Sequence, residues 1–339
     1  MSSRRSSQGP LRLGFVPVFD AAPLLVAREL GLYAGHGLDV VLSREAGWAT
    51  IRDKIVYREI DAAYALAPMP MAITLGLGTR AVPCITGLVL STHGDSITFS
   101  QKLLDAGVRD PRSFEEFVRE RKDPVIFGIP FPYSCHAFLV RAWLQSGAVR
   151  RKDVLSRLRF VVVPPPQMAV NLRAGHLDGY CASEPWNIIS AIEGAGKVVA
   201  RSADIAPGHP EKVLMTTRRF AEERAGEHET LIAVLAEACA FCEDPANRGQ
   251  IVEILSQDRN VGVPAKILRH AFEGTCFHGP DIHAPDAAKA RWVIDGLRDL
   301  VPGVPHPDWK GAAASFRLDL YEKAMARHLS PGWTGAAKR

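Results

Sequence analysis

Residues 11–66, LRLGFVPVFDAAPLLVARELGLYAGHGLDVVLSREAGWATIRDKIVYREIDAAYAL, decide the class of fold, because short apolar runs alternate there with longer amphipathic ones. The short runs predict strands at 11–16, 38–42 and 62–66. The longer runs predict helices at about 21–31 and 48–58. This alternation is typical of α/β domains with largely parallel sheets.

The same alternation continues to about residue 201, and then the pattern changes. Further strands are predicted at 83–90, 125–129, 159–163, 177–181 and 197–201, with helices at 134–146, 167–174 and 186–194. After residue 210 the strand pattern stops. Helices are predicted at 217–227, 229–242, 247–256, 264–273, 285–300 and 311–327. We therefore expect the C-terminal region to consist of helices packed onto an existing sheet.

Composition indicates a globular chain. With 339 residues, of which 47% are hydrophobic and 23% charged, two domains are expected. The longest apolar stretch, 231–242, is interrupted by Glu237 and is shorter than the roughly 18 residues of a membrane span. The net charge of +4 is scattered and forms no basic stripe. These features argue against a membrane protein and against direct nucleic-acid binding.

The first ten residues, Met1 to Pro10, contain two arginines and four serines but no apolar run. A secretion signal needs such a run, and the first strand already begins at residue 11. We therefore expect the protein to work in the cytoplasm.

No cofactor, metal site or enzyme motif is predicted. Six scattered cysteines, at positions 84, 135, 181, 239, 242 and 276, indicate reduced thiols rather than a disulfide framework. Cys239 and Cys242 share one helix face, which favours a core position over a redox pair. Cys276, His278 and His283 match none of the standard zinc spacings. No HExxH motif, phosphate loop or dinucleotide fingerprint is present.

Ligands of parallel sheets bind where strands lead into helices, and three such loops contain polar or aromatic residues, at 43–48, 130–136 and 164–168. Four motifs occur in order at or near these and later strand exits: GWATIRD (47–53), PPPQM (164–168), GYCASEPWN (179–187) and HPEKVL (209–214). In this respect the chain, from about 11 to 260, resembles the nitrate- and bicarbonate-binding proteins of ABC uptake systems, the NrtA/CmpA type. The absence of a leader resembles the cytoplasmic NasS-type nitrate/nitrite sensors of the same family.

The resemblance implies a two-lobed, type II periplasmic-binding-protein fold with two crossovers. Lobe I would comprise residues 1–90 and 203–339, and lobe II residues 91–202. The crossovers would lie at 84–100 and 198–214, beside the ligand cleft. Lobes of this kind close around a ligand by a hinge motion.

The resemblance also implies three ligand-binding residues: Trp48, His136 and Lys212. An indole N–H, an imidazole N–H and an ammonium are hydrogen-bond donors, which suits a small anion taken out of water. Gln167 and Glu184 are weaker candidates for ligand binding. Their structural interpretation is that Gln167 caps the helix after the prolines and Glu184 bonds loop amides beside Trp186.

Asp95 departs from the pattern, because transport relatives carry an uncharged glutamine at this place. An ionised carboxylate only accepts hydrogen bonds and repels nitrate. Either Asp95 points toward His136 or Lys212 and keeps them charged, or it is protonated, or the ligand is not a simple monoanion. The loop residues Tyr133 and Ser134, where relatives often have glycines, also imply a changed pocket shape.

The function implied by the resemblance is that of a cytoplasmic nitrate/nitrite sensor. Such a sensor regulates nitrate assimilation by holding an RNA-binding antiterminator of the ANTAR type until the anion binds. One alternative is the substrate-binding protein of an ABC-type nitrate/bicarbonate uptake system. Another is an enzyme like the pyrimidine synthases of thiamine biosynthesis, which share the fold. Only Cys135 and His136 stand near the cleft, and adjacent helix residues point about 100° apart, so they form no nucleophile and base pair.

Overall fold

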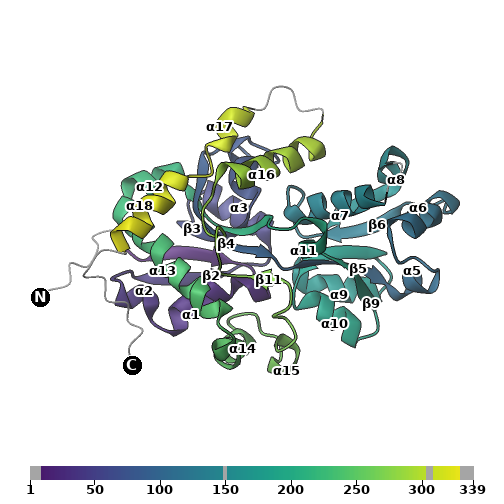
Figure 1. The fold of residues 1–339 in the computed structure, drawn as a ribbon, viewed down its shortest axis with the longest axis horizontal. Coiled ribbons are helices and arrows are strands. Elements are labelled where there is room, and N and C mark those ends of the chain that lie inside the picture. Colours follow the sequence, from purple (N-terminus) through teal and green to yellow (C-terminus); the bar gives the residue numbers. More distant parts are fainter. Residues whose placement is uncertain (1–8, 148–150, 303–307, 329–339) are drawn as a thin grey trace, which may run out of the picture.

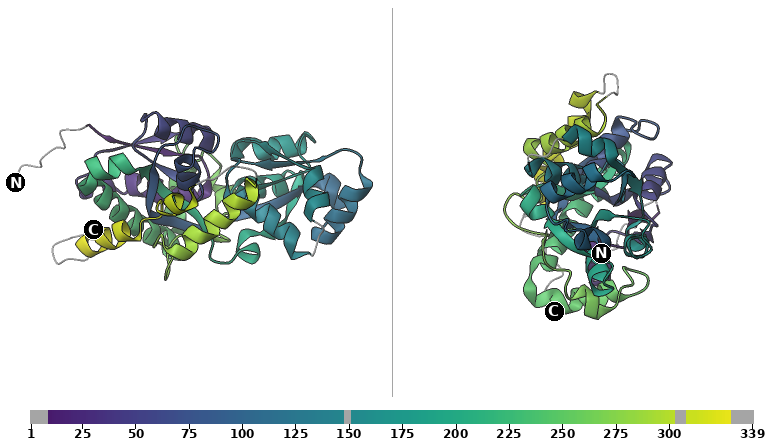
Figure 2. Two further views of the ribbon diagram at one scale, coloured as in Figure 1. Left: turned by 90° about the horizontal axis from the view of Figure 1, so that it is seen from above. Right: turned by 90° about the vertical axis from the view of Figure 1, so that its right-hand side faces the viewer.

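The computed structural model describes residues 9–147, 151–302 and 308–328. Two β-sheets lie side by side along the longest axis of the molecule, with helices packed around each (Figures 1 and 2). A large hydrophobic core surrounds the first sheet, and two smaller cores lie on the second. Residues 1–8 of the N-terminal segment that was considered for a secretion signal lie outside the described residues.

The first sheet has six strands in the order β11-β4-β10-β3-β1-β2. Its strands are β1 (Leu11–Phe15), β2 (Val40–Arg44), β3 (Ala62–Leu66), β4 (Cys84–His93), β10 (Pro210–Thr217) and β11 (Thr275–Cys276). β1 is parallel to β2 and β3, whereas β10 is antiparallel to β3 and β4. All five side chains of β3 are buried, as expected of a strand covered on both faces.

Helices from both ends of the chain surround this sheet. The N-terminal ones are η1 (Phe19–Ala21), α1 (Ala22–Glu29), α2 (Leu32–Gly35), α3 (Trp48–Val56) and α4 (Met69–Thr74). The C-terminal ones are α12 (Arg218–Glu223), α13 (Ala225–Glu243), η2 (Pro245–Asn247), α14 (Arg248–Ser256), α15 (Ala265–Leu268), α16 (Ala287–Leu300), α17 (Trp309–Ala313) and α18 (Leu318–His328). α13 packs against α1 and β4, so the C-terminal helices complete the first core. Among the described helices, none is long and apolar enough to cross a membrane.

The second sheet has five strands in the order β7-β6-β8-β5-β9. They are β5 (Asp95–Ser100), β6 (Val125–Ile129), β7 (Leu158–Val162), β8 (Gly179–Ser183) and β9 (Gly196–Arg201). Its helices are α5 (Gln101–Asp105), α6 (Pro111–Glu120), α7 (Cys135–Ser146), α8 (Arg151–Arg157), α9 (Pro165–Arg173), α10 (Trp186–Ile192) and α11 (Ser202–Ile205). β6 is parallel to β7 and β8, and β5 is antiparallel to β8 and β9.

The chain passes between the sheets twice. It leaves β4 for β5 at Gly94, whose φ of 95° is a conformation that glycine adopts without strain. It returns from β9 to β10 through 202–209. The two passages are joined directly, because the Gly208 N–H donates a hydrogen bond of 2.6 Å to His93 Nε2. The division of the chain into lobes at residues 90 and 203 stays a prediction, although the sheets change at these two passages.

The expected fold class, α/β with two lobes, two crossover strands and a helical C-terminal region, is confirmed. Two details are corrected. The sheets are mixed rather than largely parallel, because the crossover strands β5 and β10 run antiparallel to their neighbours. Strands also do not stop at residue 210, since β10 is a central strand and β11 follows. The charged residues near the start of β10 break the apolar run that indicated the other strands.

Candidate functional site

Polar side chains from both sheets meet at one fully buried position beside the crossover strands. Lys212, from β10, and Asp95, the first residue of β5, have exposures of 0% and 1%. Trp48 at the start of α3 and His136 in the first turn of α7 are both 0% exposed. The structure thus brings together the four residues that the sequence indicated most strongly.

Lys212 is the centre of the group. Its Nζ donates hydrogen bonds to Asp20 Oδ2 (2.6 Å), Ser183 Oγ (3.0 Å) and Glu211 Oε1 (3.0 Å). Asp20 lies in η1 after the first strand, and Ser183 ends β8 in the second sheet. Lys212 therefore links the two sheets at the point where they face each other.

Asp95 lies between His136 and Lys212. Its Oδ1 is 3.2 Å from His136 Nε2 and 4.0 Å from Lys212 Nζ, and it accepts a hydrogen bond of 2.6 Å from Ser183 Oγ. Burial alone raises the pKa of a carboxyl, but His136 and then Lys212 hold the pKa of Asp95 well below its usual range. Of the alternatives for Asp95, the geometry agrees with the one in which it points toward His136 and Lys212.

The pKa of Glu211 is shifted in the opposite direction to that of Asp95. Burial, and then the negative charge of Asp95, raises the pKa of Glu211 from 4.5 to about 8. Lys212 has its pKa raised although burial opposes this, because Asp20, Glu211 and Asp95 surround the ammonium. Two buried carboxyl groups thus face each other, one strongly acidic and one that retains its proton near neutral pH.

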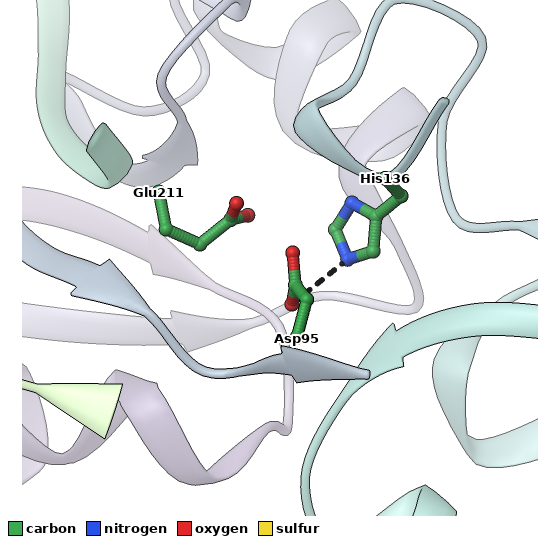
Figure 3. A group of neighbouring side chains, drawn as sticks. All are labelled: Asp95, His136 and Glu211. Atoms are coloured by element: carbon green, nitrogen blue, oxygen red, sulfur yellow. Dashed lines mark ion pairs between the residues drawn. The ribbon is translucent and has the colours of Figure 1, made fainter. Parts of the chain in front are cut away.

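Figure 3 shows that the carboxyl groups of Asp95 and Glu211 and the ring of His136 point toward a common centre. One ligand atom from each lies within 4.8 Å of the others, a spacing that a metal ion could bridge. The ammonium of Lys212, however, is 3.0 Å from Glu211 Oε1. A second cation beside it would be repelled, so the donor set fits a metal ion poorly.

Aromatic side chains cover this group. Trp48 has its ring 5.8 Å from Lys212 Nζ and 6.2 Å from the ring of His136. Tyr64, on β3, has its ring 5.8 Å from the same ammonium. Among the described residues, neither Trp48 Nε1 nor His136 Nδ1 has a hydrogen-bond partner. Buried donors of this kind point to a bound acceptor.

Local structure explains how the helices present these residues. α7 begins after Ser134, whose Oγ accepts a hydrogen bond from the Ala137 N–H. This N-cap satisfies one amide of the first helical turn, the turn that carries His136. α3 starts directly after Gly47. A helix N-terminus favours a negative charge nearby, and two of them approach the cluster through Trp48 and His136.

The two weaker candidates lie elsewhere. Gln167 is exposed on α9, and the N-terminus of that helix has no side-chain cap, so the capping role expected for it is not seen. Glu184 is buried, and its Oε2 accepts a hydrogen bond of 3.1 Å from the Ile188 N–H, so its structural role is to bond an amide in the first turn of α10 rather than a loop amide. Its carbonyl oxygen accepts a hydrogen bond of 2.8 Å from the Phe19 N–H, a contact between the two halves. Burial raises the pKa of Glu184 to about 7.

Asp20, Ser183 and Glu211 are site residues that the sequence did not indicate as such. Glu211 and Ser183 stand in the motifs at 209–214 and 179–187, but nothing in those motifs distinguishes them from structural residues. Asp20 follows the first strand by a few residues, and a polar residue at a strand exit was the available signal.

The remaining sequence candidates do not join the site. Cys239 and Cys242 are buried in α13, in agreement with the core interpretation. His278 Nδ1 is 2.9 Å from His283 Nε2, next to Cys276, in the loop around β11. The two rings are thus bonded to each other rather than aimed at a common point. Cys135 lies beside the site, where its Sγ contacts the Pro210 carbonyl oxygen at 3.5 Å.

Comparison with known proteins identifies the family. A model described as the NMT1-like family matches residues 5–256. The chain belongs to this family. The expected resemblance to proteins of the NrtA/CmpA type is also confirmed.

Three relatives illustrate what the chain is similar to, two named for import or transport and one for nitrate/nitrite binding. The chain is 38% identical over 277 residues to the nitrate import ATP-binding protein NrtC of Synechocystis, covering 81% of this chain and 41% of that protein. It is 35% identical over 300 residues to the bicarbonate transport ATP-binding protein CmpC of Synechococcus elongatus, covering 85% and 44%. It is 29% identical over 279 residues to the nitrate/nitrite binding protein NrtA of the same organism, covering 79% and 62%. The chain thus spans less than half the length of the first two relatives.

One solved structure shows the fold directly. The periplasmic nitrate-binding protein NrtA from Synechocystis superposes with a TM-score of 0.85 at 24% sequence identity, and the match covers 97% of this chain and 91% of that one. At this level of identity the likeness concerns the fold alone. The NMT1-like chain therefore has the architecture of a periplasmic binding protein.

Proposed function

We propose that this NMT1-like protein binds nitrate or nitrite between its two lobes and reports the bound state to another macromolecule. The observation that carries the proposal is the convergence of Trp48, His136 and Lys212 on one buried position. These side chains offer an indole N–H, an imidazole N–H and an ammonium, and a nitrate or nitrite ion offers only acceptors. Such a site binds rather than transforms its ligand.

The position of the site supports lobe closure as the signal. Lys212 comes from one crossover strand and Asp95 from the other, and Ser183 in the second sheet bonds to both of them. Because Lys212 is 0% exposed, a ligand can reach it only when the lobes separate. Binding and closure are therefore coupled, as in hinge-closing receptors.

We propose further that the protein is cytoplasmic and that the open, anion-free form binds an RNA-binding antiterminator of the ANTAR type. The relatives with 38% and 35% identity are a nitrate import ATP-binding protein and a bicarbonate transport ATP-binding protein. ATP is a cytoplasmic nucleotide, which supports a role on that side of the membrane. Closure of the lobes would release the antiterminator, so that nitrate assimilation genes are expressed when the anion is present.

Calorimetry on the purified protein tests the binding step. Sodium nitrate and sodium nitrite should give saturable heats, and bicarbonate serves as the competing ligand. If none of the three anions binds, the proposal fails at this first step.

Light scattering on a preformed complex with the antiterminator tests the regulatory step. Added nitrate should dissociate the complex, and by linkage the antiterminator should weaken nitrate binding by the same factor, typically about 5 to 150-fold. A complex that persists at saturating anion contradicts the sensor function.

A second candidate is the substrate-binding protein of an ABC-type nitrate/bicarbonate uptake system. It is favoured by the match to the nitrate/nitrite binding protein NrtA over 79% of this chain. Immunodetection of the native protein in cell fractions separates the two functions. Recovery outside the cytoplasmic fraction supports uptake and contradicts the antiterminator mechanism.

A further inference from the structure

We propose that Glu211 binds the anion as a neutral carboxylic acid, so that the anion enters the site together with a proton. This inference rests on the proposed function, since it concerns the same site. It assigns to Glu211 a hydrogen-bond donor role that a carboxylate cannot have.

The geometry places Glu211 beside the anion-binding donors. Its side chain is 0% exposed, and its carboxyl group faces Asp95 and His136 (Figure 3). Oε1 accepts the hydrogen bond from Lys212 Nζ. Oε2 is buried, has no hydrogen-bond partner among the described residues, and lies 3.4 Å from His209 Nε2. A proton on Glu211 can be donated to the facing carboxylate of Asp95, which helps to raise the pKa of Glu211, and an anion bound between the two groups would accept it instead.

Charge balance favours this proton. Asp20, Asp95 and Glu211 would contribute three negative charges if all were ionised, and Lys212 contributes one positive charge, which leaves −3 + 1 = −2. Adding an anion to a negatively charged, water-excluded site is strongly unfavourable. A proton on Glu211, taken up as the lobes close over the anion, reduces this negative charge by one.

Burial and then Asp95 raise the pKa of Glu211, whereas Lys212 and then His136 lower it. The facing groups are Asp95 of β5, His136 and Cys135 of α7, Lys212 of β10, Asp20 of η1, Tyr64 of β3, Cys181 of β8 and His209. Lys212 favours ionisation of Glu211, but Asp20 partly neutralises Lys212 at 2.6 Å. Burial and Asp95 prevail, and the pKa of Glu211 rises to about 8.

Opening of the lobes removes the cause of the raised pKa of Glu211. A ligand must enter through an opened cleft, in which Glu211 contacts water and its pKa returns toward the ordinary 4.5. Closure raises that pKa again, so closure takes up a proton. The protonated state favours the closed, bound form fully below pH 4.5, and this advantage is lost as the pH rises through about 8. Between these limits the affinity for nitrate falls by up to about tenfold per pH unit.

The test is calorimetry of nitrate binding in two buffers of different ionisation enthalpy at about pH 6.5. The wild type should take up close to one proton per nitrate bound, and its Kd should rise with pH. Glu211→Gln keeps an N–H donor at this position but cannot titrate, so its proton uptake and its pH slope should disappear. Glu184→Gln is the matched control, because Glu184 is the other buried glutamate with a raised pKa, and its proton uptake should equal that of the wild type.

Each outcome decides the matter. Absence of nitrate and nitrite binding in the wild type contradicts the proposed function itself. Anion binding without proton uptake, or proton uptake that persists in Glu211→Gln, overturns the role of Glu211 but leaves the proposed anion binding intact. Uptake lost only in Glu184→Gln would assign the proton to that residue and overturn it equally. Tight Zn²⁺ binding that Glu211→Gln abolishes would identify a metal site instead. If Glu211→Gln does not fold, Asp95→Asn provides the test. This variant removes the negative charge that helps to keep the proton on Glu211, so proton uptake per nitrate bound should decrease.

Discussion

Glu211 and Lys212 are neighbours in β10, yet both side chains reach the same buried site, with Glu211 Oε1 and Lys212 Nζ 3.0 Å apart. Adjacent residues of a regular strand point to opposite faces of the sheet. The pairing of β10 with β4 shifts register on both sides of Lys212, between Pro210 and Lys212 and between Lys212 and Val213. Such a bulge changes the direction of a side chain and is common beside functional sites. The irregular strand thus supplies an acid and an ammonium to one point.

Replacement of Lys212 should destabilise the protein and abolish anion binding. In Lys212→Met the carboxylate of Asp20 remains buried without its partner at 2.6 Å, which costs about 3 to 5 kcal/mol in free energy of unfolding. Nitrate affinity should fall by more than about a hundredfold. The double variant Asp20→Asn, Lys212→Met should regain part of the stability but none of the affinity. Urea denaturation and calorimetry measure the two effects, and near wild-type values of both for Lys212→Met would contradict the site.

The sequence predicted the apolar strands of the fold but not the charged strand β10 or its ion pair. β1, β3 and β6 are short, nearly continuous apolar runs, so periodicity was sufficient to predict them. β10 carries Glu211 and Lys212 in its buried part, and charged residues are rarely fully buried unless they are paired. The family resemblance therefore indicated Lys212, whereas the ion pair with Asp20 spans 192 positions and required the structure.

Asp95 provides a second prediction, because its role can be separated from its charge. In Asp95→Asn the side chain can still contact Ser183 and His136, but it no longer repels an anion. Nitrate binding should stay within about tenfold of wild type if Asp95 only keeps its neighbours charged, and should tighten if repulsion dominates. Calorimetry distinguishes these results. Complete loss of binding would contradict both and indicate a cationic ligand.

Gly94, at the passage from β4 to β5, should not tolerate a side chain. Its φ is 95°, and an added Cβ would lie 2.5 Å from Thr275 Oγ1. Gly175 is a matched control, because its φ is also positive, at 75°, but an added Cβ meets nothing within 4 Å. Gly94→Ala should therefore lower the free energy of unfolding by about 1 to 3 kcal/mol more than Gly175→Ala does. Combining Gly94→Ala with Thr275→Ala should recover part of that difference. Equal costs in urea denaturation of the two single variants would show that the contact with β11 does not constrain this passage.

His93 links the two passages between the sheets, and this contact should make the hinge sensitive to acid. The Gly208 N–H donates to His93 Nε2, so this nitrogen must be unprotonated. Burial, and then the neighbouring His209, lowers the pKa of His93 from 6.5 to about 4. A lowered histidine pKa means that the folded form is favoured above pH 6.5 and loses this advantage as the pH falls toward 4.

The Gly208 amide reports on this contact directly. Its hydrogen exchange, corrected for the intrinsic effect of pH, should accelerate as the pH falls below 6.5 toward 4. In His93→Ala the amide should exchange fast at every pH, because its acceptor is missing. His176→Ala, which removes an exposed histidine near the end of α9, should behave like the wild type. Protection of Gly208 that is equal in His93→Ala and wild type would mean that the two passages are held together without His93, and that acid acts on closure through the buried carboxyl groups instead.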